Sequence, residues 1–195
     1  MANVNHKRVR QLMNEKRSRI NDRQFFSSRI LAGHFEDMAA AQTKRYRYNR
    51  RVRVLLSWSP KSGTVAQTDN QTIEINAGNP FVTAVRGREN RYQIVCGLFA
   101  HELGHILYTD FPVGQTHLNA FAAGHWFPCC PELKTPKDVR CEKELWEYLG
   151  QEESKKQAFL HLVHRISNVL EDGYIENRMM NEFPGTFAYG LQKLR

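Results

Sequence analysis

The chain has 195 residues, of which 41% are hydrophobic and 25% are charged, a composition typical of a globular protein with one sizeable core. It contains no apolar run near the roughly 18 residues that a membrane span requires, and it begins with charged residues rather than an apolar signal region. These features argue against a membrane or secreted protein, and we expect a cytoplasmic one.

The net charge of +8 is unevenly distributed along the chain. Residues 1–53 carry 14 Lys and Arg against 4 Asp and Glu, whereas residues 54–195 carry 14 against 16. Such a basic segment could contact nucleic acid, but charge runs more often form a solvated helix face. We therefore expect a basic helical segment over residues 1–50, with nucleic acid an unlikely partner, and one domain over residues 51–195.

Hydrophobic periodicity predicts the main elements in chain order. Apolar residues at helical spacing predict a helix from Asn21, a capping residue, to about residue 46. Alternation predicts strands over residues 51–58 and 72–76. Prolines and glycines predict that residues 111–150 are largely irregular, with a helical turn over residues 143–149, and that they could form a lid or a pocket wall. A last helix is expected over residues 153–181, with an apolar stripe made of Phe159, Leu162, Val163, Ile166, Val169 and Leu170.

The motif His101-Glu102-Leu103-Gly104-His105 lies in an apolar run from Ile94 to Phe111 that predicts a buried helix. On a helix, His101 and His105 lie one turn apart on the same face, so both imidazoles can reach one ion. Glu102 is rotated by about 100° and could reach a water molecule on that ion. Two imidazoles, a carboxylate base and an open position are the parts of a hydrolytic zinc site.

A zinc ion held by two histidines needs a third protein ligand. The segment from Asn168 to Glu176 gathers three carboxylates within about two helical turns. Helical periodicity does not choose among them. We favour Glu171 as the third metal ligand, with Asp172 as the second choice. We expect Glu176 to accept the N–H of one histidine and so fix its tautomer.

Peptide hydrolysis also requires a hydrogen-bond donor for the oxyanion, and Tyr174 is the first candidate. His125 and His164 are the others. The four cysteines lack the spaced pairs of a structural zinc site, so we do not favour a second metal at His125, Cys129 and Cys141. Glu102 and Tyr174 are therefore the catalytic candidates.

The metal motif, followed by a helix with Asn168, Glu171 and Asp172, resembles the gluzincins, the thermolysin-like zinc peptidases. More narrowly, the chain resembles a metallopeptidase domain of bacterial and phage proteins that often precedes a von Willebrand factor A domain. The similar stretches are Thr68-Asp69 with Ile73–Asn76, then residues 101–111 and 168–176. One departure is Ile175, which stands where gluzincins commonly place an Asp four residues after the ligand Glu.

The resemblance implies an α+β, zincin-like fold, in which a small mixed sheet packs on a central metal-binding helix with further helices. It implies that Thr72–Asn76 is the edge strand beside the cleft, where an extended peptide could add as a strand. It also implies Zn²⁺ as the cofactor and a peptide or protein as the substrate. A von Willebrand factor A domain, or another domain beyond the C-terminus, is the expected partner, because the apolar residues 187–191 suggest a longer protein.

Two alternatives to a peptidase stay open at this point. The chain could be an interaction module that zinc stabilises without catalysis. It could also bind nucleic acid through residues 44–53, where arginines and tyrosines alternate.

Overall fold

The computed structural model describes residues 7–11, 20–45 and 51–195, and sequence-based expectations for the other residues lie outside this description. The chain forms two compact units. The first contains the described residues up to Thr109 together with Tyr174–Arg195, and the second is Asp110–Gly173. This division differs from the expected boundary at residue 50, because residues of the predicted N-terminal helix pack into the core of the first unit.

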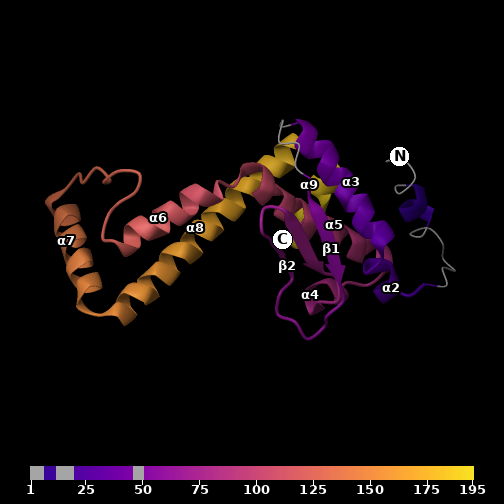
Figure 1. The fold of residues 1–195 in the computed structure, drawn as a ribbon, viewed down its shortest axis with the longest axis horizontal. Helices are drawn as coiled ribbons and strands as arrows, with labels where there is room; N and C mark the ends of the chain where they lie inside the picture. The colour runs from indigo at the N-terminus through magenta and orange to yellow at the C-terminus, as the bar shows by residue number, and fades with distance from the viewer. Residues whose placement is uncertain (1–6, 12–19, 46–50) are drawn as a thin grey trace. The chain divides into compact units, whose positions relative to one another are not determined.

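The first unit contains a three-stranded mixed sheet (Figure 1). Its strands β1 (Arg53–Ser57), β2 (Ala66–Thr68) and β3 (Thr72–Asn76) lie in the order β1-β3-β2. Strand β1 is parallel to β3, and β2 is antiparallel to it. The sheet and its surrounding helices confirm the α+β class. The expectation that Thr72–Asn76 is an edge strand is wrong, because β3 pairs with β1 on one side and with β2 on the other. Strand β2 has only three residues, too few to show alternation in the sequence.

The helices of the first unit surround a single long helix, α5 (Arg88–Tyr108), which packs against β2 and β3. The predicted helix from Asn21 is two helices, α2 (Asp22–Phe26) and α3 (Arg29–Arg45). Asn21 caps α2 as expected, in a capping box with Gln24. A short helix, α4 (Pro80–Thr83), precedes α5, and α9 (Thr186–Leu194) ends the chain.

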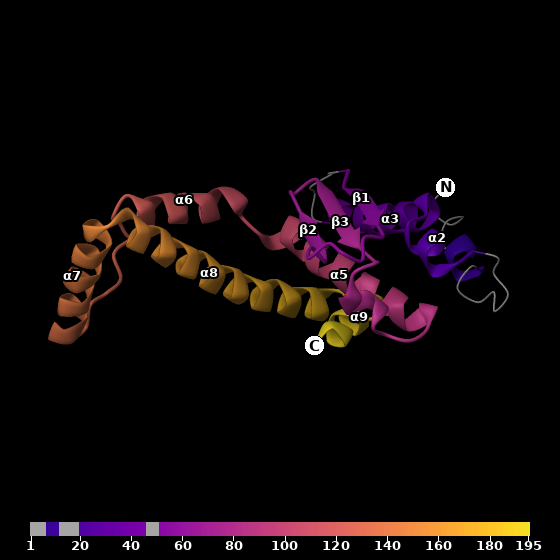
Figure 2. The same ribbon diagram turned by 90° about the horizontal axis from the view of Figure 1, so that it is seen from below.

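Helices α5 and α9 approach each other at a pair of glycines. Figures 1 and 2 both place α9 beside α5. A Cβ atom on Gly190 would lie 2.6 Å from the backbone nitrogen of Gly97 and 2.9 Å from its Cα atom. Because neither residue has a side chain, the two backbones touch. This contact fixes α5 against the C-terminal helix, and Phe187 packs edge-on against Phe99 beside it, with ring centroids 5.8 Å apart.

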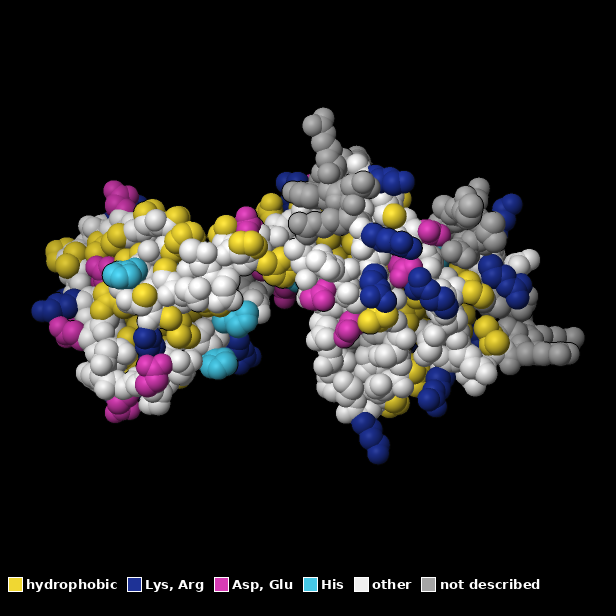
Figure 3. Space-filling model, viewed as in Figure 1, with side chains coloured by type: hydrophobic (Ala, Val, Ile, Leu, Met, Phe, Trp, Pro, Cys, Tyr) yellow, Lys and Arg dark blue, Asp and Glu magenta, His cyan; other side chains and the backbone are white. Residues whose placement is uncertain are grey.

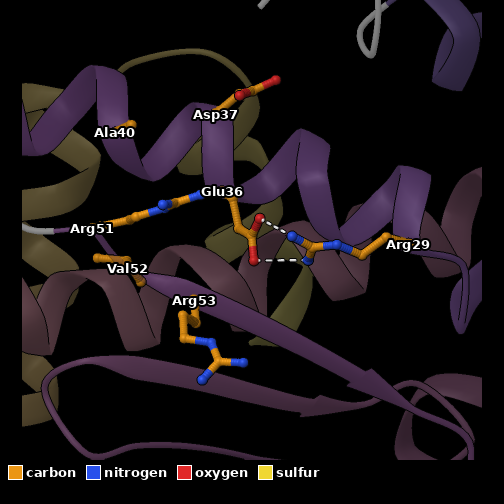
Figure 4. A pocket seen from close by; sticks show the side chains of 7 residues that line it. All are labelled: Arg29, Glu36, Asp37, Ala40, Arg51, Val52 and Arg53. Carbon is orange, nitrogen blue, oxygen red and sulfur yellow. Dashed lines mark hydrogen bonds and ion pairs between the residues drawn. The ribbon is translucent and has the colours of Figure 1, made fainter.

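The outer edge of β1 is covered by Glu36 of α3 (Figure 4). The Glu36 carboxylate accepts the N–H of Val54 at 3.1 Å, and both of its oxygens accept hydrogen bonds from Arg29, at 2.8 and 2.7 Å. An edge strand leaves backbone groups open to pairing with other chains, and this carboxylate occupies one of them.

The second unit is helical, contrary to the expectation that residues 111–150 are irregular. It contains α6 (Phe111–Ala122), α7 (Pro136–Gln151) and most of α8 (Glu153–Glu182), which continues into the first unit. Pro112 and Pro136 stand in the first turn of their helices, where a missing N–H costs nothing, so these prolines begin helices rather than break them. An aromatic cluster forms the centre of this unit and comprises Phe121, Trp126, Trp146 and Phe159.

The predicted apolar stripe of α8 is largely exposed. Four residues of the stripe have exposed fractions between 51% and 70%: Leu162, Ile166, Val169 and Leu170. The buried residues of α8 are Ile175 and Met179, which lie further along the helix and in the first unit. Among the described residues, none of the helices combines the length and the apolar character that crossing a membrane requires.

We predict that Gly190→Ala lowers the free energy of unfolding by roughly 2 kcal/mol or more, because the added methyl group has no space against Gly97. This loss should exceed the ~1 kcal/mol that alanine gains in helix propensity. Urea denaturation measures the change. The control is Gly63→Ala, where nothing lies within 4 Å of the added atom. Equal stability of the two variants would contradict the close packing of α5 and α9.

We also predict that Glu36 makes the stability of the protein depend on pH. Partial burial alone would raise the pKa of Glu36, but the hydrogen bonds from Arg29 and Val54 and the nearby positive charges together lower it. A lowered folded-state pKa gives stability that is complete above the unfolded-state pKa and is lost as the pH falls through the folded-state value.

Glu36→Gln should therefore reduce stability at neutral pH and flatten its decline in acid, relative to the native chain. Thermal unfolding across this pH range measures both effects. Glu74→Gln, at an exposed carboxyl on β3, is the matched control. An unchanged acid decline in Glu36→Gln would show that this contact does not stabilise the fold.

Candidate metal centre

Helix α5 places His101 and His105 on one face, as the spacing predicts. Their ring centroids are 5.0 Å apart, and both side chains are partly buried. The residues around them from Ile94 to Leu107 are otherwise largely buried apolar residues. Two polar rings in such a helix require polar partners.

Gly104, between the two histidines, is the point at which α8 approaches α5. A Cβ atom at Gly104 would lie 3.0 Å from Cγ of Met179 and 3.5 Å from Cβ of Ile175. Both of these α8 residues are fully buried. The missing side chain therefore lets the C-terminal part of α8 lie directly against the face of α5 that carries the histidines.

Ligand atoms of His101, His105 and Asp172 all lie within 4.8 Å of one another. The expected first choice, Glu171, is not in this group, and the second choice, Asp172, is. Helix geometry explains the difference. The buried residues Ile175 and Met179 mark the face of α8 that packs into the first unit. Asp172 and Glu176 lie about 40° apart around the helix, on one side of that face. Glu171 lies on its other side, about 100° from Asp172.

Each imidazole has a partner at its Nδ1 atom. Nδ1 of His101 lies 3.2 Å from Oε1 of Glu176, and Nδ1 of His105 lies 2.9 Å from Oγ1 of Thr109. An ionised carboxylate can only accept, so Nδ1 of His101 donates to Glu176, and Nε2 is the atom that would bind an ion. This geometry agrees with the expectation that Glu176 accepts the N–H of a histidine, here His101.

Two residues of this arrangement were missed by the sequence analysis. Thr109 lies four residues after His105, so the helical spacing that paired the histidines could also have identified it. Arg195 donates from Nη2 to Oε2 of Glu176 at 3.1 Å and so holds the carboxylate that orients His101. No pattern in the sequence links Arg195 to Glu176, because α9 must first fold back along α5.

Glu102 is buried, with only 7% of its surface exposed. Tyr174 is 53% exposed and lies about 160° around α8 from both Asp172 and Glu176. The helix therefore does not direct its hydroxyl toward the histidines, and the placement gives no support to Tyr174 as an oxyanion donor. The other two candidates, His125 and His164, belong to the second unit.

The cysteines add no second metal group within the described residues. Cys96 is fully buried in α5, and burial raises the pKa of its thiol to about 12, so it is a core residue rather than a reactive thiol. Cys129, Cys130 and Cys141 are exposed, free thiols.

The donor set fits zinc. Two imidazole nitrogens and one carboxylate oxygen are a common set of protein ligands in catalytic zinc sites, where the fourth position stays open. The buried Glu102 directly follows His101 in the sequence. Glu176 and Thr109, which lie outside the donor set, hydrogen-bond to the two imidazole rings.

Comparisons with protein-family models, with curated proteins and with solved structures found no match to this chain. A functional conclusion therefore depends on the chemistry of the site itself.

We predict that Asp172→Asn weakens zinc binding by at least about tenfold, because an amide is a poorer zinc ligand than a carboxylate. Glu171→Gln, one residue away on the same helix, should bind zinc like the native chain. Competition with a chromogenic zinc chelator measures both affinities. If Glu171→Gln weakens binding and Asp172→Asn does not, the ligand assignment is reversed.

Proposed function

We propose that this protein is a zinc-dependent peptidase with a zincin-like fold, in which His101, His105 and Asp172 hold the metal and Glu102 is the general base. The observation that carries the proposal is the convergence of two imidazoles from α5 and a carboxylate from α8, with ligand atoms within 4.8 Å of one another. Hydrolysis also needs a general base, and the buried Glu102 lies next to His101 in the sequence.

The chain's own residues have separate roles in this proposal. Glu102 accepts a proton from the attacking water and later delivers it to the leaving amine. Glu176 and Thr109 orient the two imidazoles through their Nδ1 atoms. Bound zinc supplies a Lewis acid that polarises the scissile carbonyl group and activates the water.

The sheet supports a peptide substrate. Strand β2 is an antiparallel edge strand, and α5 packs against it. An extended peptide that pairs with β2 would run alongside the helix that carries the histidines. In this proposal β2, rather than Thr72–Asn76, is the edge strand that pairs with an extended peptide substrate.

Substitution of Glu102 tests the general base. Glu102→Gln should lower kcat/KM on a peptide library by about 10²- to 10⁴-fold and leave the zinc content unchanged, because the amide cannot accept the proton. Glu89→Gln, in the exposed first turn of the same helix, is the matched control and should retain activity.

Two outcomes would contradict the peptidase proposal. Full hydrolysis by Glu102→Gln would remove Glu102 from the mechanism. A native chain that binds zinc stoichiometrically but cleaves no peptide in the library, while chelation lowers its melting temperature, would favour the zinc-stabilised interaction module.

A further inference from the structure

A hollow of about 470 Å³ opens between α3 and β1 in the first unit (Figure 4). It shares no residue with the metal centre. Its lining is rich in arginine and comprises Arg29, Glu36, Asp37, Ala40, Arg51, Val52 and Arg53.

The charges at one end of this hollow are already matched. Glu36 is held in a two-point ion pair by Arg29 and also accepts the Val54 N–H. The carboxylate of Asp37 points away from that pair (Figure 4). Glu36 therefore bridges α3 and β1 at Val54, and the rest of the lining on the β1 side is formed by Arg51, Val52 and Arg53.

Arg51 and Arg53 supply the positive charge on that side. Both are exposed and flank the buried Val52, so they alternate along one extended segment at about 6.6 Å. Within the described residues, no ion pair joins either side chain to a carboxylate, although the charge of Arg51 is near enough to Glu36 to help lower the pKa of that carboxyl group. Two guanidinium groups beside an open hollow form a built site for anionic groups.

The surrounding surface is basic as well. Figure 3 shows Lys and Arg side chains gathered over α3 and β1. The described residues up to position 53, which are 7–11, 20–45 and 51–53, carry nine Lys and Arg against three Asp and Glu. Such a field attracts a polyanion rather than a single small anion.

We propose that the hollow between α3 and β1 binds the phosphate backbone of a nucleic-acid strand, with Arg51 and Arg53 each contacting a phosphate. The planar guanidinium donates two parallel hydrogen bonds to phosphate oxygens. A phosphodiester chain carries a charge at every nucleotide, so it satisfies two arginines at close spacing without any particular sequence. An acidic peptide would need carboxylates placed at that same spacing.

Fluorescence anisotropy of a labelled single-stranded oligonucleotide at low salt tests the proposal on the full chain. The double variant Arg51→Gln/Arg53→Gln should bind at least about tenfold more weakly than the native chain. The slope of log affinity against log salt concentration should be shallower by about 2 in this variant, because each lost phosphate contact reduces the slope by about 1. Lys61→Gln/Arg86→Gln removes two exposed positive charges elsewhere in the first unit and should lose only about twofold.

Three results would overturn the proposal: no binding of the native chain at low salt, equal losses in the two double variants, or equally good displacement of the oligonucleotide by a polyglutamate peptide. Thermal unfolding of both variants checks that they fold. The zinc affinity of the Arg51/Arg53 variant should be native. Because the hollow lies apart from the histidines, failure of the peptidase proposal leaves this result unaffected.

Discussion

The approach of α8 to α5 at Gly104 is the contact on which the candidate site depends. Gly104 lies between the two histidines, and its lack of a side chain admits Ile175 and Met179 of α8. With those residues buried, Glu176 reaches Nδ1 of His101, and the acidic side of α8 faces the imidazoles. A side chain at this position would place its Cβ atom 3.0 Å from Cγ of Met179, so the Met179 side chain would have to shift. The candidate site therefore depends on the packing of α8 side chains against a glycine of α5 as much as on its polar side chains.

The rest of the first unit holds α5 in place for this contact. The glycine pair at Gly97 and Gly190 joins it to α9, and α9 returns Arg195 to Glu176. On another side, β2 and β3 pack against α5, and Glu36 covers the outer edge of the sheet at β1. Helix α5 is thus buried among several elements, and its two histidines have little freedom to move, a condition that a preorganised site requires.

Local spacing predicted the parts of this structure that depend on one helix or strand. The pairing of His101 with His105 follows from the i, i+4 rule, and their rings do lie together. The choice of Asp172 over Glu171 was beyond such reasoning, because it depends on which face of α8 is buried at Ile175. The central position of Thr72–Asn76 likewise depends on a three-residue partner strand with too few residues for a pattern. Prolines misled the prediction at residues 111–150, since the same residue that ends one helix begins another.

X-ray absorption spectroscopy of the zinc-loaded full chain identifies the atoms bound to the metal and so tests whether His101, His105 and Asp172 hold it. We expect scattering from two imidazole rings and from oxygen ligands, with no sulfur, and the loss of one imidazole signal in His105→Ala. A zinc–sulfur distance of ~2.3 Å would place the ion on the exposed cysteines instead. A spectrum without imidazole scattering would contradict the joining of α5 and α8 around a metal ion.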